Sequence, residues 1–204
     1  MSRNQKNNLQ VHLEIDEQLV SRFARLFSKG VTIQARTGCS LKEFICGQLG
    51  VAEDYLEKRI QTIFLNGKAI DNYETPLIGD GDSLALSAAM PGLVGAVFRR
   101  DGYYAAFRKT VTYRDNGSGA CALDGAVTVK LFNLTIKEMG PGMLKRGVAV
   151  DGSDLQHLLR EFADDFRRGC THIAFDGRHI TFDDLLEKIP PNRNIHLSID
   201  TSPS

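Results

Sequence analysis

The sequence predicts an α+β fold built from two tandem modules. Alternating apolar and polar residues indicate several short strands, and amphipathic segments that begin at capping residues indicate helices. The order of these elements in the first half of the chain recurs in the second half, which is typical of an internal repeat. The length of 204 residues and the 42% share of hydrophobic residues allow one or two domains, each with its own core.

The first module begins with the alternating segment 9–15, and a second strand is expected over 31–35. A helix should follow directly, because Ser40 and Glu43 form a capping box and apolar residues then recur at helical spacing. Asn66-Gly67 predicts a two-residue hairpin turn. The remaining strands are expected over 60–65, 68–70 and 83–87, the last one introduced by the turn Asp80-Gly81-Asp82.

The second module repeats this order. Ser153 and Gln156 predict a capping box at the start of a helix, and its apolar stripe runs on to Phe166. Asp176-Gly177 predicts a hairpin turn in the place that Asn66-Gly67 has in the first module. The expected strands are 127–136, 147–150, 171–175, 178–180 and 194–199, with a turn at Gly140-Pro141-Gly142 between the first two.

A hairpin, a helix that crosses the sheet and a further pair of strands make the β-grasp arrangement, in which one amphipathic helix covers one sheet face. We therefore expect two tandem β-grasp modules joined by a basic β-hairpin. The expected domains are residues 9–95, a hairpin and flexible linker over 96–125, and residues 126–199.

Three motifs carry a family resemblance: Phe64-Leu-Asn-Gly-Lys68, the segment from Pro76-Leu77 to the Asp80-Gly81-Asp82 turn and its strand, and Ala88-Ala-Met-Pro-Gly92. With these motifs the first module resembles the MoaD and ThiS sulfur-carrier family, which implies a ubiquitin-like fold. In that family a free C-terminal Gly-Gly is adenylated and then converted to a thiocarboxylate. Gly92 matches the penultimate glycine, but Leu93 takes the last position and the chain continues to Ser204. The resemblance therefore implies sulfur carriage only if a new terminus forms near Gly92.

The linker concentrates positive charge in a chain whose formal net charge is zero. Cations beside aromatic rings can bind phosphate or stacked bases, but zero net charge gives weak overall steering towards nucleic acid. We expect an acidic face of a protein partner instead, and no nucleic-acid partner. The candidate partner-binding residues are Arg99, Arg100, Tyr103, Tyr104, Arg108 and Lys109.

The four cysteines are sparse and irregularly spaced, which favours buried or free thiols in a reducing compartment over a disulfide framework. No apolar run is long enough to span a membrane, so we expect a cytoplasmic protein. Strand alternation and the hairpin would bring Cys170, His172 and His179 to one sheet face, where they could bind a metal ion. That face is the solvated one and lacks supporting groups, so we expect no metal there.

The sequence shows no nucleophile elbow, phosphate-binding loop or iron–sulfur spacing, so we expect no catalytic residues and no cofactor. The first functional hypothesis is a non-enzymatic ubiquitin-like interaction or scaffold module, whose sheet edges could also support a homo-oligomer. The alternative is a precursor or fused sulfur carrier in molybdopterin, thiamin or related sulfur metabolism. An oligonucleotide-binding protein would instead show binding that depends steeply on salt.

Overall fold

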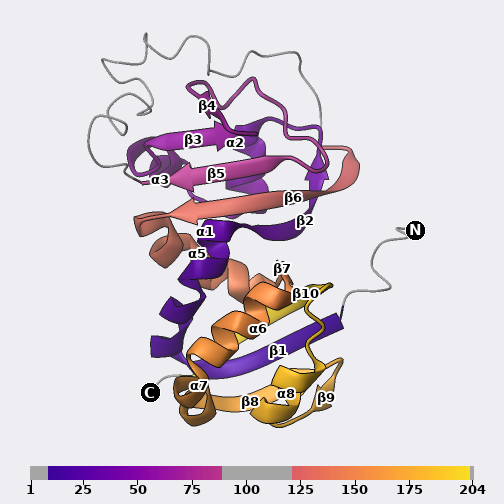
Figure 1. Ribbon diagram of the computed structural model, residues 1–204. Coiled ribbons are helices and arrows are strands. Elements are labelled where there is room, and N and C mark those ends of the chain that lie inside the picture. Colours follow the sequence, from indigo (N-terminus) through magenta and orange to yellow (C-terminus); the bar gives the residue numbers. More distant parts are fainter. Residues whose placement is uncertain (1–8, 89–120, 203–204) are drawn as a thin grey trace. The chain divides into compact units, whose positions relative to one another are not determined.

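The computed structural model describes residues 9–88 and 121–202 (Figure 1). These residues hold ten strands and seven α-helices, and the fold is mixed α/β, as expected for an α+β protein. The chain forms two compact units. Unit 1 combines residues 1–31 with 140–204, and unit 2 comprises residues 32–139.

The units do not follow the predicted division at 9–95 and 126–199, because the first strand of each predicted module lies in the other unit. Strand β1 (Leu9–Asp16) pairs in parallel with β10 (Asn194–Ser202) and antiparallel with β8 (Cys170–Phe175), all in unit 1. Strand β6 (Leu123–Phe132) pairs in parallel with β5 (Ser83–Ser87) in unit 2. The two predicted modules thus exchange their first strands.

In each unit the strands have the same spatial order when they are counted from the edge that is formed by the two-residue hairpin. Unit 1 has the order β9 (Arg178–His179), β8, β1, β10 and β7 (Val148–Asp151). Unit 2 has the order β4 (Lys68–Ile70), β3 (Thr62–Leu65), β5, β6 and β2 (Val31–Thr37). In both units the hairpin is followed by an antiparallel neighbour and then by a parallel one.

Both predicted hairpin turns are confirmed. Asn66 and Gly67 have φ of 51° and 76°, and Asp176 and Gly177 have φ of 48° and 74°. The side chain of each first turn residue also holds the third strand of its sheet, since Asn66 Oδ1 accepts from the Ser83 amide at 2.9 Å and Asp176 Oδ1 accepts from the Gln10 amide at 2.8 Å. The local turn chemistry therefore also positions a strand that is distant in sequence.

In unit 2 the helix after β2 begins where predicted. Ser40 is its N-cap, and the hydroxyl accepts a hydrogen bond from the Glu43 amide at 3.2 Å. The first turn, α2 (Leu41–Glu43), continues as a π-helical segment, η2 (Phe44–Gln48), and α3 (Glu53–Lys58) follows. The predicted apolar face is buried at Leu41, Phe44, Ile45 and Leu49.

Helix α5 (Leu134–Arg146) corrects two predictions, the strand up to residue 136 and the turn at 140–142. The strand ends at Phe132 because Asn133 has a positive φ of 59°. Gly140 and Pro141 lie inside the helix, with Gly140 buried and Pro141 exposed. A Cβ at residue 140 would lie 3.1 Å from the Phe27 ring, so the glycine permits close packing of the helix.

In unit 1 the predicted Ser153–Gln156 capping box is wrong. Asp151 is the N-cap of α6 (Gly152–Glu161), and its carboxylate accepts from the amides of Ser153 and Asp154. The Gln156 side chain bonds the carbonyl of Leu186 instead. The predicted apolar stripe is also split into two helices, because the chain leaves helical geometry at Phe162 before α7 (Ala163–Gly169).

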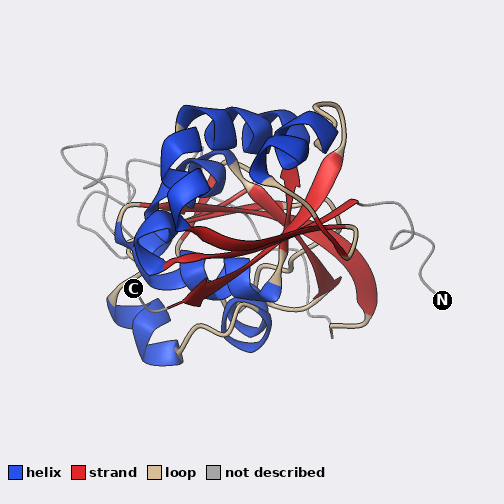
Figure 2. Ribbon diagram, turned by 90° about the horizontal axis from the view of Figure 1, so that it is seen from below, coloured by secondary structure: helices blue, strands red, loops and turns tan. Residues whose placement is uncertain are grey.

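The core of unit 1 lies between its strands and its helices. The remaining helical segments are η1 (Glu17–Phe23), α1 (Ala24–Lys29) and α8 (Phe182–Lys188). Phe166 packs edge-on against Phe23 and is stacked with Phe182, with ring centroids 5.5 Å and 6.2 Å away. Helices α6, α7 and α8 lie on one side of β1 and β8 (Figure 1), and Figure 2 shows the strand ribbons in red beside the helix ribbons in blue.

Candidate functional site: a histidine-rich sheet face

The face of the unit 1 sheet that points away from its core gathers polar side chains. Strand β1 buries Val11, Leu13 and Ile15 on the core side and leaves the alternate residues partly exposed. The strand register places polar residues of β8, β9 and β10 beside them. We call this surface the histidine face, and its residues are His12, Glu14, His172, His179, His196, Ser198 and Asp200. It holds four of the five histidines of the chain.

His12 lies close to two polar side chains of β10 on the histidine face. Its Nδ1 lies 3.0 Å from the hydroxyl oxygen of Ser198, and its Nε2 lies 3.8 Å from a carboxylate oxygen of Asp200. The first distance is a hydrogen bond, whereas the second is too long for one. A nucleophilic serine needs a base that a third group orients through a hydrogen bond. The arrangement therefore supports polar recognition better than nucleophilic catalysis.

The metal-binding candidates Cys170, His172 and His179 do not share one face. The hairpin pairs Ala174 with His179 as predicted, and the rings of His172 and His179 stack with centroids 4.9 Å apart. Between Glu14 and Ile15 the register shifts, so that Cys170 pairs with Ile15 on the core side. A bulge adds one residue and thereby reverses the side on which the next side chain lies.

Burial makes Cys170 a poor ligand. Desolvation, assisted by the nearby Asp16 carboxylate, raises the pKa of its thiol to about 11. A thiol with that pKa stays protonated at neutral pH, and the thiolate is the form that binds metal or attacks electrophiles. Cys170 is therefore a packing residue next to the histidine face.

The prediction of free thiols is wrong for two of the four cysteines. Cys39 and Cys121 form a disulfide across 82 positions of sequence, and Cys46 and Cys170 are free. Cys39 follows β2 and Cys121 precedes β6, so the bond joins two segments that the fold of unit 2 brings together. Within residues 9–88 and 121–202, only Cys39, Glu43 and Cys121 bring three metal-ligating atoms close together.

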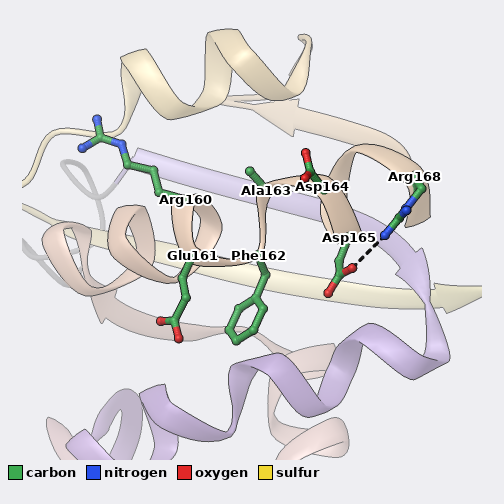
Figure 3. Close-up of a pocket in the computed structure, with 7 residues that line it drawn as sticks. All are labelled: Arg160, Glu161, Phe162, Ala163, Asp164, Asp165 and Arg168. Atoms are coloured by element: carbon green, nitrogen blue, oxygen red, sulfur yellow. Dashed lines mark hydrogen bonds and ion pairs between the residues drawn. The ribbon is translucent and has the colours of Figure 1, made fainter.

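A shallow hollow of about 330 Å³ lies where α6 meets α7 (Figure 3). The charges that line it are largely paired. Asp165 bonds Arg168 at 3.0 Å and Arg22 at 2.8 Å, and the Arg22 guanidinium also covers the Phe162 ring at 4.5 Å. The lining residues are Arg160, Glu161, Phe162, Ala163, Asp164, Asp165 and Arg168. We assign this hollow a structural role, because the ion pair between Arg22 and Asp165 connects η1 to α7.

The predicted carrier-tail residue and the predicted basic hairpin lie outside the described residues. This applies to Gly92, Arg99, Arg100, Tyr103, Tyr104, Arg108 and Lys109. Of the histidine face, the sequence pattern placed His172 and His179 together but did not reveal the residues of β1 and β10, because sequence alternation shows which residues face solvent but not which strands are neighbours.

None of the helices in the described part of the chain is long and apolar enough to cross a membrane. No protein-family model, curated protein or solved structure matches this chain.

Proposed function

We propose that this chain is a non-enzymatic, ubiquitin-like protein-interaction module related to the MoaD and ThiS family, with two β-grasp-like modules. The observation that carries the proposal is the histidine face, a regular polar surface on the side of the sheet away from the core. Small molecules are usually bound in concave, largely apolar pockets, whereas protein partners bind across extended surfaces with polar rims. The polarity of this face, and its extent over β1, β8, β9 and β10, fit a protein partner.

The equivalence of the two sheets supports the tandem part of the proposal. Each sheet has a hairpin at one edge, and the side chain of its first turn residue bonds the third strand. Each also has a parallel pair formed by its third and fourth strands. The two sheets share the same strand order and the same hydrogen bond from the turn side chain to the third strand. This likeness favours two copies of one module.

The proposal is tested by recovery of partners from the native cells with the full chain as bait. We expect specific partners to bind the wild type and the binding to fall about tenfold or more in a His172→Ala/His179→Ala double variant, because hot-spot residues dominate such interfaces. His157→Ala is the matched control, since His157 is the fifth histidine and lies on helix α6. Equal recovery by the double variant and the control would contradict a role for this face.

Intact mass separates the proposal from sulfur carriage. A native fragment that ends at Gly92, with one sulfur in place of one oxygen at its terminus, would replace the interaction module with a carrier precursor. A species that keeps the whole chain, without that sulfur, agrees with the module.

A further inference from the structure

Two polar side chains, the Glu43 carboxylate and the Gln48 amide, lie beside the disulfide of unit 2. The two sulfurs of Cys39 and Cys121 and a carboxylate oxygen of Glu43 all lie within 4.8 Å of one another. The amide nitrogen Nε2 of Gln48 lies 3.7 Å from the Cys39 sulfur and 3.6 Å from the Cys121 sulfur. An acceptor and a donor therefore flank the same pair of sulfurs.

Gln48 is held in this position by the backbone. Its Oε1 accepts from the Arg36 amide at 2.7 Å, and its Nε2 donates to the Arg36 carbonyl at 2.7 Å. A donor that is fixed in this way can stabilise negative charge on sulfur, as the outer groups of metal sites do for their ligands. Cys39 itself is fully buried, whereas Glu43 is exposed and Cys121 is half-buried. The cluster is thus anchored on one side and open to solvent on the other.

We propose that the reduced form of Cys39 and Cys121, together with Glu43, binds one zinc ion, so that the disulfide and the metal site are alternative states of the same residues. Two thiolates and one carboxylate are a donor set that suits zinc, and a water molecule completes the four-coordinate geometry. Magnesium and calcium prefer sites made of oxygen alone.

Conversion of the disulfide to the zinc site takes two steps, reduction and metal binding. A dithiol reductant cleaves the sulfur–sulfur bond through a mixed disulfide, becomes a cyclic disulfide itself, and leaves two protein thiols. Zinc then binds both thiolates and releases their two protons. Two sulfurs on a tetrahedral zinc at about 2.3 Å each lie about 3.8 Å apart. Zinc binding therefore requires the sulfurs to separate, and we expect Cys121 to move, because it is half-buried whereas Cys39 is fully buried.

Cobalt(II) provides the test, because a thiolate-to-cobalt charge-transfer band appears only when sulfur binds the metal. Cobalt bound by histidines of the histidine face would not give this band. The untagged full chain is reduced with a dithiol, freed of the dithiol without oxygen, and titrated with Co²⁺. We expect one ion per chain with the charge-transfer band in the reduced protein and no band in the oxidised protein. Zinc should then displace the cobalt.

Variants identify the ligands. Cys121→Ser should abolish the band, and Glu43→Gln, which keeps the disulfide and therefore the oxidised fold, should weaken Co²⁺ binding about tenfold or more. Cys46→Ser and Glu53→Gln are the matched controls and should bind as the wild type does. Absence of the band in reduced wild-type protein, or a band that survives Cys121→Ser, would overturn the proposal. If the Glu43→Gln variant binds Co²⁺ as tightly as the Glu53→Gln variant does, Glu43 is not a ligand.

Discussion

The guanidinium Nη2 of Arg22 lies 2.8 Å from a carboxylate oxygen of Asp165, although 143 positions separate the two residues in the sequence. Whereas that pair joins η1 to α7, two further ion pairs join α1 to α6, Arg25 with Glu161 and Lys29 with Asp154. Along the three pairs the number of the basic residue rises while that of the acidic residue falls. Basic residues of η1 and α1 therefore face acidic residues of α6 and α7 in antiparallel register. These ion pairs connect η1 and α1, which follow strand β1, to the helices α6 and α7 of unit 1.

Replacement of Arg22 should destabilise unit 1 measurably. Arg22→Met removes a partly exposed ion pair and the contact with the Phe162 ring, which together are worth about 1 to 2 kcal/mol. Urea denaturation followed by circular dichroism measures the change. Arg168→Met is the control, because the Arg168 side chain pairs with the same Asp165 but is 77% exposed, and it should change the free energy of unfolding by less than about 0.5 kcal/mol. Equal effects of the two variants would contradict the assignment.

Two glycines in helices should respond oppositely to alanine. A Cβ on Gly152 would clash with the Pro190 carbonyl oxygen and lie 2.9 Å from that of Arg193, and backbone atoms cannot turn away. Gly152→Ala should therefore lower the free energy of unfolding by about 3 kcal/mol or more. At Gly142 no atom lies within 4 Å of the added Cβ, so Gly142→Ala should stabilise α5 by roughly 0.5 to 1 kcal/mol. Melting temperatures that shift in the same direction for both variants would contradict this packing.

The cap of α6 should make stability depend on pH. Hydrogen bonds from Ser153 and from the amides of Asp154 and Ser153 hold the pKa of Asp151 below its ordinary value. The contribution of Asp151 is therefore complete above the ordinary aspartate pKa, and it is lost as the pH falls through the lower pKa of the folded state. At pH 7, Asp151→Ala should cost about 1 kcal/mol, and the difference from wild type should shrink in acid. Ser153→Ala should cost less than Asp151→Ala in the same denaturation series, and the reverse order would restore Ser153 as the cap.

Asn66 should tolerate glycine better than alanine. Its φ of 51° is unfavourable for alanine, and its side chain bonds both Asp82 and the amide of Ser83. Asn66→Gly keeps the backbone conformation and loses the side-chain bonds, at a cost of about 1 kcal/mol. Asn66→Ala adds the strain and should cost about 2 kcal/mol. Equal costs in equilibrium denaturation would mean that the turn relaxes to another conformation.

The sequence predicted the local structure better than the pairing of strands. Asn66-Gly67 and Asp176-Gly177 were correct because a two-residue turn with positive φ depends on the residues of the turn itself. The alternation in 9–15 and 194–199 showed which side chains point to the core, but it carries no information about neighbours. The parallel pairing of β1 with β10, and with it the histidine face, therefore needed the structure.

Three other features that the sequence did not predict have separate causes. Gly140-Pro141-Gly142 is typical of a turn, yet an exposed proline and the close packing of Gly140 on Phe27 keep this segment helical. The bulge at Cys170 placed one of the three candidate ligands on the core side, and no residue pattern in the sequence marked this bulge. Cys39 and Cys121 are 82 positions apart, so their spacing did not reveal the pair, nor did it suggest Glu43 as a neighbour.

The place of β1 between β8 and β10 has a consequence for biosynthesis. Strand β1 leaves the ribosome before both of the strands with which it pairs, β8 and β10. Unit 1 cannot complete its sheet on a nascent chain that stops short of β10, because β8 supplies only one of the two neighbours of β1. Chaperones that bind exposed apolar segments should therefore engage this chain before β10 has been translated.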